Sequence, residues 1–256
     1  MPSRKKLVIG NWKMNPQTLI EAKRIFTAFK KTKRNDKDVT VVLCPPFTFI
    51  SELNKSYSGN KIFFGAQDIF WKDEGSYTGE VSAKMLQSVG ARFVIIGHSE
   101  RRNMGENDSL ISQKLITALK SGMHTILCVG ESTRDIHGKY LHTLRDQIIS
   151  ALEGVESNLL KKIIIAYEPV WTIGEGHSAI DNHDLYQTIL FIKKQLIEKY
   201  DRKIGESISI IYGGSVDSEN AHILIKEGGV DGFLVGRNSL NPQEFSKIIS
   251  EVSRKK

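Results

Sequence analysis

Short apolar segments rich in β-branched residues recur along this chain about every 20 to 45 residues, and this repeat constrains its fold more than any other feature. Each interval has room for one strand and one crossover helix. The segments are apolar throughout rather than alternating, which is typical of parallel strands buried on both faces. They lie at residues 7–9, 39–43, 62–64, 93–96, 125–129, 163–167, 208–212 and 232–235.

The intervals carry apolar residues at the three-and-four spacing of an amphipathic helix, most clearly over residues 19–29 and 185–196. We therefore expect one helix in each interval. The last helix is expected to begin at Asn241-Pro242, because Asn is a good N-cap and proline is tolerated at the first helical position. The pair Gly228-Gly229 indicates a helix end.

Eight strand-helix units in series, with no linker and no low-complexity tract, favour an α/β fold. The architecture that we expect is a (β/α)8 barrel (TIM barrel), a single domain that spans residues 1–256. An open, doubly wound sheet is the alternative. In a barrel the catalytic groups lie just after the carboxyl ends of the strands. The residues that follow each apolar segment are therefore the first candidates for a site.

The net positive charge of the chain does not by itself indicate a polyanion partner. The formal net charge is +7, but Lys and Arg are spread along the chain and gather mainly at its ends and at residues 30–34. We interpret them as solvated surface rather than as a nucleic-acid site. A modest positive field would still speed the capture of a small phosphate dianion.

The cysteine content and the hydropathy pattern bear on the compartment. The two cysteines, Cys44 and Cys128, are too few for a disulfide framework or a zinc cluster, so we expect free thiols. No stretch approaches the roughly 18 apolar residues of a membrane helix. The first residues have too short an apolar part for a secretory signal. We expect a soluble, cytoplasmic protein without a membrane partner.

Polar side chains follow three of the apolar segments. Asn11 and Lys13 follow the first, His98 and Glu100 the fourth, and Glu168 the sixth. Each has an ordinary interpretation when taken singly: a hydrogen-bonded structural histidine, or a solvated loop glutamate or lysine. A carboxylate base, an imidazole and an ammonium at one barrel mouth together favour a catalytic site.

Two glycine-containing turns follow the last two segments. Gly213-Gly214-Ser215 comes after the seventh and Gly236-Arg237 after the eighth. Glycines let backbone N–H groups approach an anion, and loops in these places of a barrel often bind phosphate. Two ordinary turns are the alternative. We expect the Arg237 N–H to face the phosphate and its side chain to extend into solvent, because a buried unpaired guanidinium is costly.

The segment at residues 168–177 has the composition of a lid. Glu168 stands directly before a proline, which disfavours helix at the glutamate and ends the strand there. Gly174 and Gly176 allow the tip to move, while Trp171 and Ile173 give the segment an apolar face. That combination suits a loop that excludes water from the site.

Seven short motifs occur in order along the chain. They are NWKMN at 11–15, TGE at 78–80, GHSERR at 97–102, CVGE at 128–131, AYEPVW at 166–171, YGGSV at 212–216 and DGFLVG at 231–236. This set resembles the triosephosphate isomerase family, and the resemblance covers nearly the whole chain. AYEPVW and GHSERR are far more specific than any glycine motif.

The resemblance implies a glycolytic and gluconeogenic isomerase. It would interconvert dihydroxyacetone phosphate and D-glyceraldehyde 3-phosphate by proton transfer through an enediolate, with no metal and no organic cofactor. By the resemblance Glu168 is the base and His98 is a neutral imidazole that donates to the carbonyl oxygens. Asn11 and Lys13 meet the substrate oxygens and phosphate, and Glu100 supports Lys13.

The resemblance also implies binding and assembly residues. Phosphate-binding positions fall on Gly174, Ser215, Gly236 and Arg237. A homodimer is implied, in which a loop that carries Tyr77 and Thr78 inserts into the neighbouring subunit. An ordinary mobile loop is the alternative for that segment.

Several positions depart from the usual family residues. The lid has Thr172, Glu175 and His177 where alanine, threonine and lysine are usual, and Arg237 and Asn238 stand where glycine and alanine are usual. None of these changes removes a catalytic role. They put the lid motion and the geometry of the phosphate loop in question.

Two other functions remain as alternatives. A metal-dependent pentulose-phosphate epimerase would need several His and Asp ligands at strand ends, but only His98 stands at such an end, and His124 begins a strand. A non-catalytic barrel retained as a binding protein is the second alternative. Loss of Glu168, His98 or Lys13 would be its sign, and all three are present.

Overall fold

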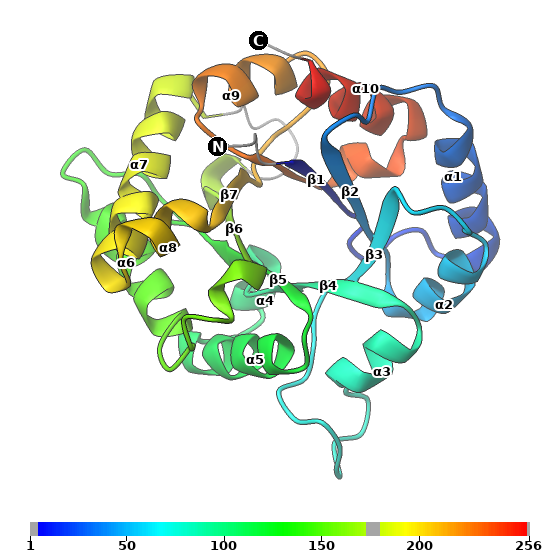
Figure 1. Cartoon of the computed structure of the whole chain (residues 1–256), viewed down its shortest axis with the longest axis horizontal. Helices are drawn as coiled ribbons and strands as arrows, with labels where there is room; N and C mark the ends of the chain where they lie inside the picture. The colour runs from blue at the N-terminus through cyan, green and yellow to red at the C-terminus, as the bar shows by residue number, and fades with distance from the viewer. Residues whose placement is uncertain (1–4, 173–179, 255–256) are drawn as a thin grey trace.

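The computed structural model describes residues 5–172 and 180–254, and its strands form one closed parallel barrel in sequence order (Figure 1). The pairing of the first strand with the last closes it, with Leu7 opposite Gly232 and Gly10 opposite Val235. The (β/α)8 barrel that the repeat predicted is therefore confirmed, and the open doubly wound sheet is wrong.

The strands coincide with the apolar segments to within two residues at either end. Their bounds are β1 (Lys6–Asn11), β2 (Val39–Cys44), β3 (Ile62–Ala66), β4 (Ala91–Ile96), β5 (His124–Val129), β6 (Ile163–Tyr167), β7 (Ser209–Tyr212) and β8 (Gly232–Val235). Because all run parallel, their carboxyl ends open on one rim.

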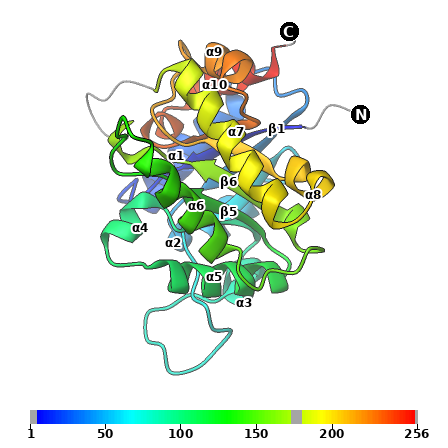
Figure 2. The ribbon, with the colours of Figure 1, turned by 90° about the vertical axis from the view of Figure 1, so that its left-hand side faces the viewer.

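The helices form a ring outside the barrel (Figures 1 and 2). Within the described residues they are α1 (Leu19–Lys31), α2 (Phe47–Lys55), α3 (Ala83–Ser88), α4 (Ser99–Asn103), α5 (Asp108–Lys120), α6 (Lys139–Ala151), α7 (Asn182–Lys199), α8 (Arg202–Ser207), α9 (Ala221–Glu227) and α10 (Pro242–Ser253). Short 3-10 turns are η1 (Leu160–Lys162), η2 (Val170–Thr172) and η3 (Arg237–Leu240). None of the helices described is both long and apolar enough to cross a bilayer.

The expectation of one helix per interval is wrong in two places. The interval after β4 holds α4 and α5, and the interval after β6 holds α7 and α8. The extra helices are the short ones, α4 and α8, and each begins at a capping side chain. His98 accepts from the backbone N–H of Glu100 at 3.2 Å at the start of α4, and Asp201 accepts from that of Ile204 at 2.7 Å at the start of α8.

The predicted helix ends are confirmed. Asn241 caps α10, its side chain accepting from the N–H groups of Gln243 and Glu244 at 3.1 Å each, with proline at the first helical position. Helix α9 stops at Gly228, and the following Gly229 has φ 68°, a left-handed conformation that costs glycine little.

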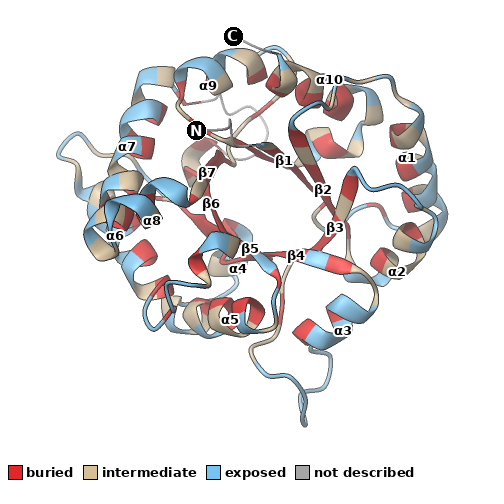
Figure 3. Cartoon of the chain, in the orientation of Figure 1, coloured by how far each residue is buried: buried red, intermediate tan, exposed pale blue. Residues whose placement is uncertain are grey.

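Buried apolar side chains form two clusters, one on each face of the barrel wall. Figure 3 shows that the buried residues lie along the strands and on part of the surface of the helices. In β1, Val8 belongs to the layer between strands and helices, which also contains Phe26 of α1. Its neighbours Leu7 and Ile9 belong to the layer inside the barrel. Successive strand residues point to opposite faces, so a strand buried on both sides must be apolar throughout.

A buried cluster of charges ties the segment after β3 to helices α4 and α5. The ammonium of Lys114 lies 2.7 Å from an Asp68 oxygen and also contacts Glu106, and Arg101 contacts both carboxylates. Burial by itself raises the pKa of Glu106, but hydrogen bonds from Lys114 and Arg101 more than offset it and hold that pKa below its usual value. The two cations therefore keep this carboxylate ionised.

We predict that Lys114→Met lowers the free energy of unfolding by about 3–5 kcal/mol, because it leaves two carboxylates without their buried cation. Chemical denaturation at neutral pH measures the loss. The matched control is Lys120→Met on the exposed end of the same helix, which should cost less than about 1 kcal/mol. Equal losses in the two variants would contradict the role given to the cluster.

Candidate active site

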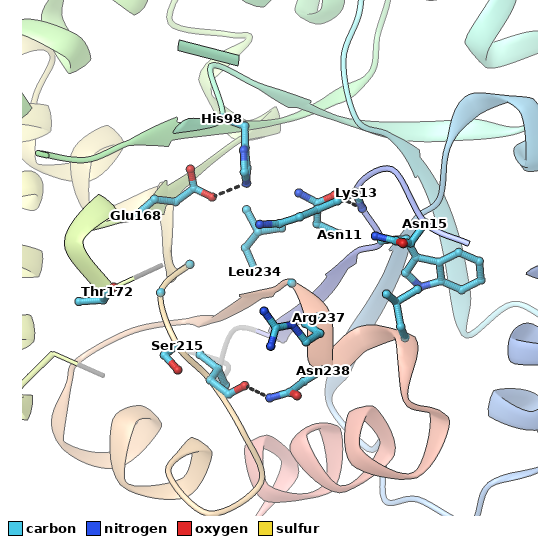
Figure 4. A pocket seen from close by; sticks show the side chains of 16 residues that line it. Asn11, Lys13, Asn15, His98, Glu168, Thr172, Ser215, Leu234, Arg237 and Asn238 are labelled. Atoms are coloured by element: carbon cyan, nitrogen blue, oxygen red, sulfur yellow. Dashed lines mark hydrogen bonds and ion pairs between the residues drawn. The ribbon is translucent and has the colours of Figure 1, made fainter. Parts of the chain in front are cut away.

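A cavity of about 330 Å³ opens at the carboxyl ends of the strands (Figure 4). The predicted site residues that line it are Asn11, Lys13, His98, Glu168, Ser215, Gly236 and Arg237. Glu100 does not line the cavity but contacts Lys13. Gly174 lies outside the residues that the structure describes, as do Glu175, Gly176 and His177. Residues separated by more than 200 positions in sequence thus share one mouth.

His98 stands directly after Gly97 at the end of β4 and is the N-cap of α4. Its Nδ1 accepts a hydrogen bond of 3.2 Å from the backbone N–H of Glu100. An acceptor nitrogen must carry a lone pair, so the ring proton belongs on Nε2 and the imidazole is neutral. His98 is buried, and Nε2 points toward Glu168 (Figure 4).

Glu168 follows β6 and has only 2% of its surface exposed. Its Oε1 lies 3.2 Å from His98 Nε2, and its Oε2 accepts from the backbone N–H of Ser99 at 3.3 Å. Two donors therefore satisfy a carboxylate that is otherwise withdrawn from water. The base and the imidazole that the sequence predicted are in direct contact.

Lys13 follows β1 in a left-handed backbone conformation, with φ 53°. Its N–H donates to the side chain of Asn11 at 3.0 Å, and its carbonyl accepts from the side chain of Gln67 at 2.8 Å. These two bonds hold a conformation that costs a non-glycine residue free energy. The Lys13 ammonium then meets Glu100 Oε1 at 2.6 Å, which confirms the predicted pairing.

The structure gives a steric reason, which the sequence did not reveal, for glycine at the two positions after β7. A Cβ on Gly213 would lie 2.8 Å from Cγ of Glu168, and one on Gly214 would clash with the Tyr212 hydroxyl and lie 2.5 Å from Oγ1 of Thr172. Both glycines therefore make room for neighbouring side chains of the site. This requirement acts in addition to any close approach of an anion to their N–H groups.

Two neighbouring residues after β8 shape the opposite wall. The side-chain amide of Asn238 donates to the carbonyl of Val216 at 2.7 Å and so links the loops after β7 and β8. Arg237 is exposed, as expected, but its side chain lines the cavity (Figure 4). The side chain is therefore exposed to solvent and next to the cavity at the same time.

The root of the segment after Glu168 is anchored by a residue that was not predicted as part of the site. Buried Glu131 accepts from Tyr167 Oη at 2.9 Å and from Trp171 Nε1 at 3.1 Å. Burial raises the pKa of Glu131, although these donors oppose the shift. Its signal in the sequence was its place just after the fifth apolar segment. Thr172 was noted as a departure only, and it lines the cavity.

Among residues 5–172 and 180–254 no group of three or more His, Cys, Asp or Glu side chains is arranged to hold a metal ion. The cavity instead combines a buried carboxylate, a neutral imidazole, an ammonium and two glycine-containing loops. These features define a phosphate-binding barrel enzyme that moves a proton next to a carbonyl group.

Comparison with known proteins specifies the enzyme further. The sequence model of the family "Triosephosphate isomerase" matches residues 6–252. Proteins named triosephosphate isomerase from Alkaliphilus metalliredigens and Dictyoglomus thermophilum are 41% and 40% identical over 249 and 248 residues, which cover 96% of this chain and 99% of each relative. One from Moorella thermoacetica is 41% identical over 96% of this chain and 98% of its own length.

The chain belongs to the triosephosphate isomerase family. It is therefore an isomerase that interconverts dihydroxyacetone phosphate and glyceraldehyde 3-phosphate, as the motifs predicted.

We predict that Gly213→Ala lowers the turnover number about 100-fold, because the new methyl group must displace the side chain of Glu168. Gly213 does not have a positive φ, so the effect comes from the contact rather than from the backbone. Steady-state kinetics measure the loss, and thermal unfolding checks that the fold persists. Turnover within about twofold of the unchanged protein would contradict this account.

Proposed function

We propose that the isomerisation runs through an enediolate, with Glu168 as the base and with His98 and Lys13 as donors to the substrate oxygens. The observation that carries this assignment is the contact of 3.2 Å between His98 Nε2 and Glu168 Oε1. It brings a carboxylate and a neutral hydrogen-bond donor to the same wall of the cavity.

The reaction needs one mobile base and fixed donors. Glu168 takes a proton from the carbon that bears the hydroxyl group of dihydroxyacetone phosphate, and negative charge develops on the carbonyl oxygen. His98 Nε2–H and the Lys13 ammonium stabilise that charge, because donors that are already aimed need no reorganisation during the step. The proton then returns from Glu168 to the neighbouring carbon, while the hydroxyl proton moves between the two oxygens. The products contain the same atoms as the substrate.

The arrangement of Glu168 corresponds to a resting state. Its carboxylate accepts hydrogen bonds from His98 Nε2–H and from the backbone N–H of Ser99. A substrate oxygen that takes the place of Oε1 at His98 would release the carboxylate toward the substrate carbon. The absence of a side chain at Gly213 supports this movement, since a Cβ there would lie only 2.8 Å from Glu168 Cγ.

Phosphate binding is assigned to the opposite wall of the cavity. The proposed donors are the backbone groups of Ser215, Gly236 and Arg237, with Lys13 and Asn11 beside them. A Cβ on Gly236 would lie 3.9 Å from the Lys13 ammonium, so this cation stands beside the β8 loop. Gly174 completes the set as a proposal from the family resemblance.

We predict that Glu168→Gln lowers the turnover number at least about 100-fold while phosphate affinity changes little, because the amide cannot accept the proton. A coupled assay that converts glyceraldehyde 3-phosphate to dihydroxyacetone phosphate measures the rate. The matched control is Glu156→Gln at an exposed position, which should keep the full rate. Near-normal turnover of the Glu168 variant would refute its assignment as the base.

The proposal extends to assembly, location and domain organisation. The segment between β3 and α3 projects from the barrel in both views (Figures 1 and 2). Tyr77, 40% exposed, packs its ring 4.7 Å from that of Phe70, which supports a preformed loop rather than a mobile one. We assign this loop, with Thr78, to a two-fold dimer contact.

A cytoplasmic location and one domain over residues 1–256 complete the proposal.

We predict that Thr78→Asp converts the dimer to a monomer and lowers activity at least about tenfold, because a charge at a buried interface is costly unless it is paired. Analytical ultracentrifugation measures the mass, and the coupled assay measures the activity. Ser157→Asp, an equal change at an exposed position, is the control that should stay dimeric. A fully active monomer would refute the dimer argument.

A further inference from the structure

We propose that the guanidinium of Arg237 is itself a ligand of the substrate phosphate, in addition to the backbone N–H of that residue. This inference rests on the proposed function, since it concerns the phosphate end of the same cavity. It adds a cationic side chain to the backbone groups proposed for that end of the cavity.

The side chain of Arg237 lies beside the two loops that are proposed to bind the phosphate. Arg237 begins the turn η3 directly after Gly236, and both line the cavity together with Ser215. In Figure 4 the Arg237 guanidinium extends from the β8 end across the cavity toward Ser215. A phosphate bound between the two loops would therefore lie within reach of this group as well as of the backbone.

The turn that carries Arg237 is held in place from both sides. Asn238 donates to the carbonyl of Val216 at 2.7 Å, and Ser239 Oγ donates to the carbonyl of Gly236 at 2.6 Å. These bonds fix the start of the arginine side chain relative to the loop after β7. A side chain whose backbone is fixed loses less conformational freedom when it binds a phosphate.

The charge around the cavity is the second argument. The ionisable side chains that line it, within the described part of the chain, are those of Lys13, His98, Glu168 and Arg237. Lys13 is paired with Glu100 at 2.6 Å, and the imidazole of His98 is neutral by its hydrogen bonding. Lys13 and Arg237 are therefore the cationic side chains beside the buried Glu168 carboxylate, and Arg237 is the one on the β8 side of the cavity, where the phosphate is proposed to bind.

The chemistry of the group is the third argument. A guanidinium presents parallel N–H donors that match two oxygens of a phosphate, whereas an ammonium acts as a point charge. The exposure of Arg237 limits the gain, because water screens the pair. We therefore expect an effect of about tenfold on phosphate affinity rather than the larger effect of a buried pair.

The test compares Arg237→Met, Arg237→Lys and the control Lys33→Met, which removes one exposed positive charge from the segment after α1. Calorimetry measures the binding of inorganic phosphate to each full-length protein. Kinetics measure kcat/KM for glyceraldehyde 3-phosphate and for glyceraldehyde without its phosphate. Thermal unfolding checks that each variant folds.

Arg237→Met should weaken phosphate binding about tenfold, equal to about 1.4 kcal/mol, and lower kcat/KM for the phosphorylated substrate by a similar factor. The phosphate affinity of Arg237→Lys should lie between that of Arg237→Met and that of the unchanged protein. Lys33→Met should change phosphate affinity by less than about twofold. The unphosphorylated substrate should react at nearly the same rate with all variants.

Two results would overturn the inference. One is equal phosphate affinity in Arg237→Met and Lys33→Met, which would leave only the long-range field of the protein. The other is an equal loss on both substrates, which would indicate a disturbed reaction centre. If Glu168→Gln kept near-normal turnover, the proposed function would fail, but phosphate calorimetry would still decide whether Arg237 binds the anion.

Discussion

The pairing of β1 with β8 is the constraint on which the rest of the structure depends. It closes a sheet of parallel strands, so that every carboxyl end meets the same rim. Lys13, His98 and Glu168 leave three different strands and reach one cavity only because the barrel is closed. An open sheet of the same strands would carry the ends of β1 and β6 away from each other.

Within that rim, one backbone hydrogen bond decides what His98 can do. The first turn of α4 directs the N–H of Glu100 at Nδ1, which assigns the ring proton to Nε2. The same histidine meets Glu168, and the residue that supplies the N–H also pairs with Lys13. A helix of five residues therefore connects the imidazole, the carboxylate and the ammonium of the site.

Much of this arrangement could be predicted from the sequence, and the failures have physical causes. The strands were predictable because burial on both faces demands a continuous apolar run, as at residues 163–167. The short helix α4 after β4 was missed because its five residues, Ser99–Asn103, carry no apolar periodicity and it begins at the His98 cap. That the exposed side chain of Arg237 also lines the cavity could not be predicted, because it depends on where the fold places the loop after β8.

The sequence by itself determined the order of strands and helices, the motifs and the chemical groups at the strand ends, because these follow from neighbours along the chain. Only the tertiary structure decided which groups touch. Ser99 and Glu168 are 69 residues apart and Lys13 and Glu100 are 87 apart, so no local pattern specifies their contacts. Gly213 must be a glycine because barrel closure brings Glu168 Cγ within van der Waals distance of it. His98 is neutral because the cap of α4 brings the N–H of Glu100 within hydrogen-bond distance of Nδ1.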